Sequence, residues 1–490
     1  MNQIARTFIL IGLVVVILLA LHFLPKLSIG ENELRRVNVL SDVLPEVYQN
    51  DEDLNFIPAV PEPPKPIITE RTIQPSNDGD TISHPSRQTA STEQPHGQEQ
   101  TDSTQANPTV VNGQTDGVTP ILDYSEGQAG GMSHFYHQLA SVQQLGRPVR
   151  VAYYGDSFIE GDIFTADLRE LLQTQFGGNG VGWVDCASQV SGFRQTVGHT
   201  YSGIKEYEVV KRPFSAANQG IAQRYFTAAQ GARISYKGSR VRKHLAQWDK
   251  STFYLRSENG LTLKTTLNGD TTVVDTVPGT PNLQTVERKA DSTAFSSISY
   301  NFSNIGGGTL LYGVALEPFH GVVVDNFSMR GSAGYTLSQI PAATLAQFAA
   351  LRPYDLIVVH FGLNVANSNQ SNYSSYTKNM GQAIAHLRQA YPQASILVVS
   401  MPDRDQRSAS GLRTMKGVEA LIAYQQIMAS DLKVSFFNLF EAMGGRESMK
   451  DLVERGLANK DYTHINFAGG KYLAKILFES LMAGYHSYGY

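Results

Sequence analysis

The chain has 490 residues, of which 41% are hydrophobic and 17% are charged, so it is long enough for more than one folded domain. Its formal net charge of −4 offers no basic surface of the kind that nucleic-acid binding requires. The single cysteine, Cys186, excludes an intramolecular disulfide and is expected to be a small buried side chain.

The first strong pattern is an apolar run over residues 7–24, after a short tail of residues 1–6. The run reaches the length that a membrane-spanning helix needs. No small-x-small cleavage site follows it cleanly and no cysteine stands ready for lipid attachment, which favours an uncleaved transmembrane signal anchor over a cleaved signal peptide. Lysine and arginine lie on both sides of the run, so the charge count alone leaves the orientation open.

Residues 25–131 are predicted to be a disordered linker rich in Pro, Ser, Thr and Gln. Between residues 58 and 120 the chain carries ten of its 21 prolines and no Phe, Tyr, Trp, Met or Cys. Such a segment cannot bury enough apolar surface to offset the entropy lost on ordering.

The folded part is expected to begin near Met132 with a short amphipathic helix. A strand follows over Val149–Tyr154, and a helical pattern starts at Ile163. From residue 201 to 308 short alternating runs replace this rhythm. Leu261–Leu267 and Thr271–Val274, separated by a turn containing Asn-Gly, form a strong hairpin signal, so we predict an inserted all-β, sandwich-like domain over 201–308.

After the insert the strand and helix rhythm resumes. It predicts an α/β fold over residues 132–200 and 309–490, with a parallel sheet and helices on both faces. Strands are expected near 321–328, 355–361, 395–401 and 433–439, and helices near 341–350, 374–391, 411–430 and 466–483.

Four short motifs carry chemistry. Ser157, in Gly155-Asp156-Ser157, follows the first strand on a strand-to-helix turn, where a hydroxyl projects above the sheet edge. Asp461 and His464, three residues apart, supply a base and the acid that orients it, which a serine nucleophile needs. Gly331 and Asn364 each follow another predicted strand, at the edge where parallel sheets bind ligands.

These motifs resemble the four blocks of the SGNH (GDSL-type) hydrolases. The resemblance implies a three-layer, flavodoxin-like α/β/α fold with Ser157, Asp461 and His464 as catalytic residues and Ser157, Gly331 and Asn364 as the oxyanion hole. Within the family the chain is similar to bacterial peptidoglycan O-acetylesterases, in the stretches 161–165, 179–184, 313–317, 442–445 and 456–458. In those enzymes a carbohydrate-binding-like β-sandwich lies in the region of the insert.

The resemblance implies a serine esterase that removes O-acetyl groups from a cell-wall glycan, without a metal or other cofactor. Two alternatives stay open: an O-acetyltransferase with the same triad, and a tethered glycan-binding protein with a vestigial triad. Such a substrate places the body of the chain in the periplasm or extracytoplasmic space, held by a single pass through the bacterial inner membrane, with no nucleic-acid partner.

Several nearby residues have other interpretations. Asp156 is expected to shape the serine turn, and His360 is an alternative base that as a strand end is more often structural. His134 and His137 are three residues apart but lack an acidic neighbour in the sequence, which disfavours a metal site. The aromatic residues of the insert, including Trp248, Phe253 and Tyr254, favour a core role over sugar stacking.

Overall fold

The computed structural model describes residues 28–29, 32–33, 67–69, 109–111, 117–409 and 411–490. The chain divides into two units, residues 1–57 and 58–490. In the first unit, β1 (Ser28–Ile29) pairs with β2 (Asn32–Glu33) in antiparallel fashion. Among the described residues, no helix combines the length and apolar character needed to cross a bilayer, and the predicted anchor at 7–24 lies outside them.

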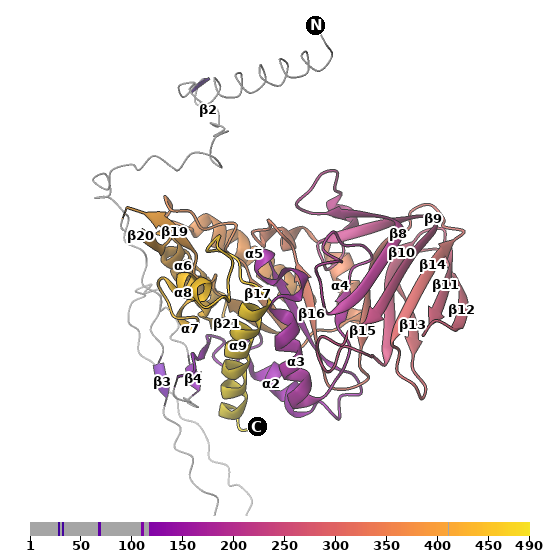
Figure 1. Ribbon diagram of the computed structural model, residues 1–490, viewed down its shortest axis with the longest axis horizontal. Coiled ribbons are helices and arrows are strands. Elements are labelled where there is room, and N and C mark those ends of the chain that lie inside the picture. Colours follow the sequence, from indigo (N-terminus) through magenta and orange to yellow (C-terminus); the bar gives the residue numbers. More distant parts are fainter. Residues whose placement is uncertain (1–27, 30–31, 34–66, 70–108, 112–116, 410) are drawn as a thin grey trace, which may run out of the picture. The chain divides into compact units, whose positions relative to one another are not determined.

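The second unit contains a mixed, mostly parallel sheet of eight strands in the order β16-β6-β17-β18-β21-β5-β4-β3 (Figure 1). Strands β16 to β21 of this order run parallel, whereas β5 pairs with β21 in antiparallel fashion. The bounds are β3 (Ile67–Thr69), β4 (Thr109–Val111), β5 (Ile121–Asp123), β6 (Val149–Gly155), β16 (Val322–Ser328), β17 (Leu356–His360), β18 (Ser395–Val399) and β21 (Ser435–Phe437).

The central strands are rich in apolar residues because both of their faces are covered. Every residue of β6, β17 and β18 is buried, as expected for parallel strands between helices. Helix α3 packs on α9 and β16, and α5 packs on α4 and α6. The helices are α2 (Ser133–Ala140), α3 (Thr165–Phe176), α4 (Ala342–Leu351), α5 (Ser374–Ala390), α6 (Gly417–Asp431), α7 (Leu439–Ala442), α8 (Ser448–Glu454) and α9 (Phe467–Ser487), with 3-10 turns η2 (Ser157–Asp162), η3 (Ala216–Asn218) and η4 (Tyr335–Gln339).

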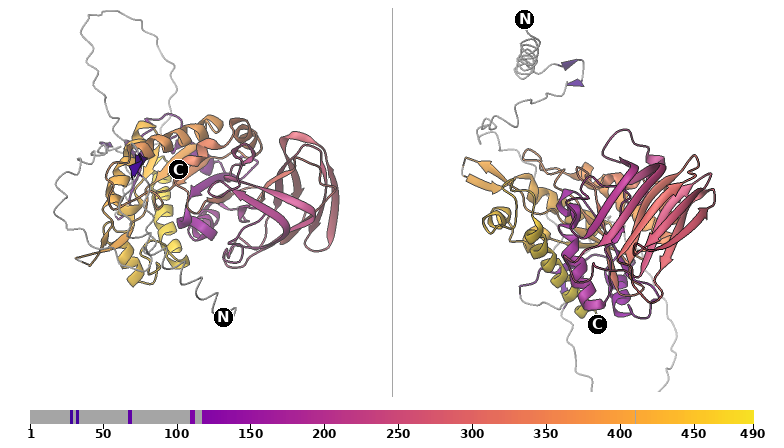
Figure 2. Two further views of the ribbon diagram at one scale, coloured as in Figure 1. Left: turned by 90° about the horizontal axis from the view of Figure 1, so that it is seen from above. Right: turned by 45° about the vertical axis from the view of Figure 1, so that its right-hand side comes forward.

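A second, antiparallel sheet of nine strands forms a β-rich region beside the first, as both views in Figure 2 make visible. It has its own apolar core, in which Trp248 and Phe253 are almost fully buried. Its strands are β7 (Gly182–Val184), β8 (Val197–Glu208), β9 (Arg224–Gly238), β10 (Lys250–Ser257), β11 (Leu261–Leu267), β12 (Thr271–Val277), β13 (Thr280–Lys289), β14 (Ser297–Ser303) and β15 (Leu310–Glu317).

The antiparallel sheet is wider than the predicted insert of 201–308. It starts at β7, before residue 200, and ends with β15, which the sequence analysis assigned to the hydrolase domain. β15 is buried along its whole length and apolar except for its last residue, so its pattern does not distinguish a parallel from an antiparallel strand. The predicted hairpin of β11 and β12 is confirmed, as is the buried state of Cys186.

Two boundaries need correction. The predicted linker ended at residue 131, but β5 lies inside that range, and Asp123 accepts hydrogen bonds from the Met132 amide at 2.9 Å and the Tyr488 hydroxyl at 3.0 Å. The folded part therefore starts before Met132. The helix predicted for 411–430 begins at Gly417, because residues 411–414 form β20 (Gly411–Thr414), a hairpin partner of β19 (Asp405–Ser408).

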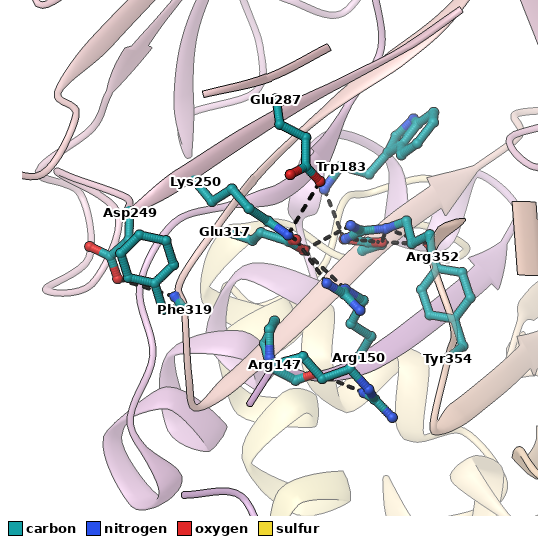
Figure 3. Close-up of polar contacts among 12 residues, drawn as sticks. Arg147, Arg150, Trp183, Asp249, Lys250, Glu287, Glu317, Phe319, Arg352 and Tyr354 are labelled. Carbon is teal, nitrogen blue, oxygen red and sulfur yellow. Dashed lines mark hydrogen bonds and ion pairs between the residues drawn. The ribbon is translucent and has the colours of Figure 1, made fainter. Parts of the chain in front are cut away.

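A buried ionic cluster joins the two sheets (Figure 3). Glu317 at the end of β15 accepts hydrogen bonds from Arg150 of β6 at 2.9 and 3.0 Å and from Arg352 at 2.7 Å. Arg352 also binds Asp325 of β16, at 2.7 and 2.9 Å. Burial opposes the ionisation of Glu317, yet the neighbouring charges of Arg150 and Arg352 hold its pKa well below the usual range.

Candidate active site

Strand register brings three of the predicted site residues to one edge of the parallel sheet. Gly155, the last residue of β6, is in register with Ser328 of β16 on one side and with His360 of β17 on the other. Ser157, Gly331 and Asn364 follow these strand ends by only a few residues. The three loops therefore leave the sheet together, at the carboxyl ends of its strands.

The Ser157 turn is held by side chains beneath it. Asp156 accepts a hydrogen bond from the Phe158 amide at 3.0 Å, which closes the first turn of η2. The Asn326 amide of β16 donates to the Ile159 carbonyl and to the Thr165 hydroxyl, both at 2.7 Å. These contacts fix the turn from the sheet side and leave Ser157 half-buried at its surface.

His464 lies within hydrogen-bonding distance of both Ser157 and Asp461. The distance from its Nε2 to the Ser157 Oγ is 3.0 Å, and from its Nδ1 to the Asp461 Oδ2 it is 2.8 Å. Because a carboxylate only accepts, the proton belongs on Nδ1, which leaves Nε2 free to accept from the hydroxyl. The arrangement can therefore remove a proton from Ser157.

Asp461 is held as a carboxylate by the backbone around it. Its Oδ1 accepts from the amides of Thr463 and His464, each at 3.0 Å. Partial burial opposes ionisation, but the hydrogen bonds from His464 and Thr463 outweigh it and lower the pKa of Asp461 below its usual value. Just beyond, Asn466 caps α9 by accepting from the Ala468 and Gly469 amides, which fixes the segment that carries His464.

Gly331 and Asn364 lie in the loops on either side of Ser157, and both are exposed. Gly331 has a φ of 79° with no atom near its missing side chain, so the left-handed backbone alone favours glycine there. The Asn364 side-chain amide donates to the Ser332 carbonyl at 3.0 Å, which ties the two loops together. Its NH₂ group keeps a second proton for a ligand.

The alternative candidates have other contacts. His360 is fully buried; its Nδ1 lies 3.0 Å from the Tyr153 hydroxyl, and burial lowers its pKa to about 3. His134, predicted to lack an acidic partner, lies 3.4 Å from the Asp355 carboxylate, because Asp355 comes from a distant part of the sequence. Among the described residues, no cluster of His, Cys, Asp and Glu has the geometry of a metal site.

The sequence analysis missed two supporting residues, Asn326 and Asp162. Asn326, next to Asp325, interrupts the apolar residues of β16, and that interruption was a usable signal. Asp162 is fully buried with a φ of 66°, and it accepts from Thr165 at 2.6 Å and binds Arg169 and Arg194. Thr165 and Arg169 belong to the following helix, α3, but Arg194 comes from the β7–β8 connection, and no local pattern pointed to that contact.

Residues 297–471 match the model of the GDSL-like lipase/acylhydrolase family. The match includes Gly331, Asn364, Asp461 and His464 and starts after Ser157. Over these residues the chain is similar to the GDSL-like lipases and acylhydrolases. It is a carboxylic ester hydrolase, which confirms the class expected from its sequence motifs.

Solved structures extend the comparison to most of the chain. A structure described as a peptidoglycan O-acetylesterase in action is 22% identical, with a TM-score of 0.62, and the alignment covers 75% of this chain and 99% of that chain. The likeness supports the fold, including the β-rich region. A family two carbohydrate esterase from Clostridium thermocellum is 11% identical over 59% of this chain and 100% of that chain, but its TM-score of 0.26 supports no inference. No curated protein matches the sequence.

Proposed function

We propose that this ester hydrolase removes O-acetyl groups from a cell-wall glycan, with peptidoglycan as the substrate. The observation that carries the proposal is the hydrogen-bonded series Ser157, His464 and Asp461, at 3.0 and 2.8 Å, beside two loops that can donate to an oxyanion. The similarity to a peptidoglycan O-acetylesterase over nearly all of that protein supports the choice of substrate. We further propose that the fold is a three-layer α/β/α domain with an inserted β-sandwich-like domain.

In the proposed mechanism the Ser157 Oγ attacks the acetyl carbonyl carbon while His464 Nε2 takes the hydroxyl proton. The negative charge that develops on the carbonyl oxygen is stabilised by the amides of Ser157 and Gly331 and by the Asn364 side chain. The bond to the sugar oxygen then breaks, and the imidazolium returns its proton to that oxygen. Water activated by His464 hydrolyses the acetyl-serine and releases acetate.

The decisive experiment incubates the purified protein with O-acetylated peptidoglycan and with acetylated xylan and measures released acetate. We expect release from peptidoglycan without any added acceptor, since water completes the reaction. Release that requires an added glycan would instead identify an acetyltransferase with the same triad. Binding to glycan without any release would favour the tethered glycan-binding protein.

We also propose that the segment 7–24 anchors the protein in the bacterial inner membrane, with the catalytic part outside the cytoplasm. An acetylated wall glycan is reachable only there. Alkaline phosphatase fused after residue 131 becomes active only when exported, so an active fusion is the expected result. A stable but inactive fusion would place the catalytic part in the cytoplasm and exclude peptidoglycan as its substrate.

A further inference from the structure

A pocket of about 110 Å³ lies where the antiparallel sheet meets the Ser157 turn. Its lining includes Glu160 of η2, Arg330, which precedes Gly331, and Glu206 of β8 and Arg224 of β9. One water molecule requires roughly 10–15 Å³ of such a cavity volume. The pocket therefore has room for on the order of ten water-sized groups, which is enough for one sugar ring. The pocket adjoins Ser157 without including it.

Carboxylates outnumber cations at the β8–β9 side of this pocket. A single guanidinium, that of Arg224, serves Asp185 at 2.5 Å, Glu206 at 3.5 Å and Glu208 at 4.0 Å. Lys211 pairs with Glu208, and Arg194, which also lines the pocket, pairs with the buried Asp162. Arg224 is more than nine-tenths buried, and its Nε has no hydrogen-bond partner among the described residues. The three carboxylates therefore give this side of the pocket surplus hydrogen-bond acceptors, whereas the Arg224 Nε–H is a donor that still lacks an acceptor.

The raised pKa of Glu206 also indicates that the carboxylates of this pocket lack sufficient positive partners. Burial raises the pKa of Glu206 to about 7, and the Arg224 charge opposes this rise only partly, since Asp185 and Glu208 repel a third negative charge. A hydroxyl or N–H donor from a ligand would stabilise the ionised carboxylate, which the protein alone leaves poorly compensated.

An exposed aromatic residue lies beside this pocket and beside the segments that carry the catalytic residues. Phe193 is 46% exposed, and its ring centre is 5.1 Å from that of Phe467, the first residue of α9. Its ring also lies against Gly161, where an added Cβ would be 2.6 Å from the ring. Its loop neighbours Val190, Ser191 and Arg194 line the pocket. Phe193 therefore adjoins the segments that carry Ser157 and His464, and also the pocket.

We propose that this pocket and Phe193 form a subsite for the sugar next to the acetylated one in a glycan strand. The inference rests on the proposed function and adds to it the ligand class of the subsite. Phe193 offers an apolar ring face to the sugar, and Glu206 and Glu208 accept from its hydroxyl or N–H groups. The subsite takes an uncharged sugar, including an N-acetylated amino sugar, because a uronic acid would bring its own carboxylate towards Asp185, Glu206 and Glu208.

The test compares kcat/KM on O-acetylated peptidoglycan with kcat/KM on p-nitrophenyl acetate, which is too small to reach the subsite while bound at Ser157. For Phe193→Ala and for Glu206→Gln we expect the ratio of kcat/KM on peptidoglycan to kcat/KM on p-nitrophenyl acetate to fall about tenfold. This fall corresponds to the loss of one contact that contributes about 1.4 kcal/mol. Two distant surface variants, Val274→Ala on β12 and Glu479→Gln on α9, are matched controls with an expected ratio equal to that of the wild type.

The outcomes separate the two proposals. If the wild type hydrolyses p-nitrophenyl acetate but releases no acetate from the glycan, the proposed substrate is wrong. If the wild type releases acetate while both Phe193→Ala and Glu206→Gln keep the wild-type ratio, the subsite is refuted and the proposed function stands. Because the readout is a ratio within one sample, partial misfolding of one variant lowers both activities and leaves the ratio unchanged.

Discussion

The buried cluster between the two sheets gives a quantitative prediction for Glu317→Gln. The Glu317 carboxylate is fully buried and accepts from Arg150 and Arg352, while the ammonium of Lys250 lies 3.2 Å away. Gln preserves the volume but removes the charge, so three cations are left with Asp325 as the remaining fully buried carboxylate of the cluster. Removing one partner from a buried ion pair costs about 3–5 kcal/mol, because the remaining charge stays desolvated.

That cost translates into a shift of the melting temperature. Unfolding entropy of about 2.1 cal/mol/K per residue gives roughly 0.8 kcal/mol/K for a folded part of about 370 residues, so 4 kcal/mol lowers the melting temperature by about 5 °C. Glu287→Gln is a matched control, since Glu287 approaches the same Lys250 at 3.9 Å but is 41% exposed. An exposed pair contributes about 0–1 kcal/mol.

Differential scanning calorimetry of wild type, Glu317→Gln and Glu287→Gln measures both shifts under one condition. The expected difference between the melting temperatures of the two variants is several degrees, so a Glu317→Gln variant that melts within about 1 °C of Glu287→Gln would refute the reasoning. The two sheets would then be held by their apolar contacts, and the ionic cluster would contribute no net stability.

Three further outcomes follow from the fold and the site. Asn364→Ala should lower kcat on p-nitrophenyl acetate by roughly 10²–10³ with little change in KM, since one oxyanion donor is lost; an unchanged kcat would remove Asn364 from the site. Burial lowers the pKa of His360 to about 3, so the neutral histidine stabilises the folded state fully above pH 6.5, and this stabilisation is lost as the pH falls towards 3. Between pH 7 and pH 4 the free energy of unfolding in urea should therefore fall by about 3 kcal/mol less in His360→Asn than in the wild type. Equal losses in the two proteins would contradict this. A protein starting at residue 117 should be soluble and active, whereas one starting at Met132 loses β5 and should melt at a lower temperature; equal melting would show that β5 is dispensable.

Much of the site could be predicted because its groups follow strand ends or form a short local motif. Gly155, Ser328 and His360 are in register, so residues just beyond each strand must lie together, and the sequence marks those strands by their mainly apolar residues. Asp461 and His464 meet through backbone contacts three residues apart. The predicted contact of His464 with Ser157 joins residues far apart in the chain, and it was indicated by the need of a serine nucleophile for a base and by the resemblance to the family.

What the sequence did not reveal depends on partners that are distant along the chain. Asp355 binds His134, and Glu317 binds Arg150 and Arg352, through contacts for which the local patterns held no signal. β15 was placed in the α/β domain, residues 309–490, because a fully buried strand has the same apolar pattern in either type of sheet. β5 was missed because three residues are too short for a period.

The central claim is that Ser157 is the nucleophile, and covalent labelling tests it most directly. The protein is treated with a fluorophosphonate, which reacts with activated serine hydroxyls, and the modified peptide is identified by mass spectrometry. We expect a single adduct on Ser157, lost in Ser157→Ala and formed much more slowly in His464→Ala, because His464 Nε2 lies 3.0 Å from the hydroxyl. An adduct on another residue, or ester hydrolysis at the wild-type rate in Ser157→Ala, would contradict it.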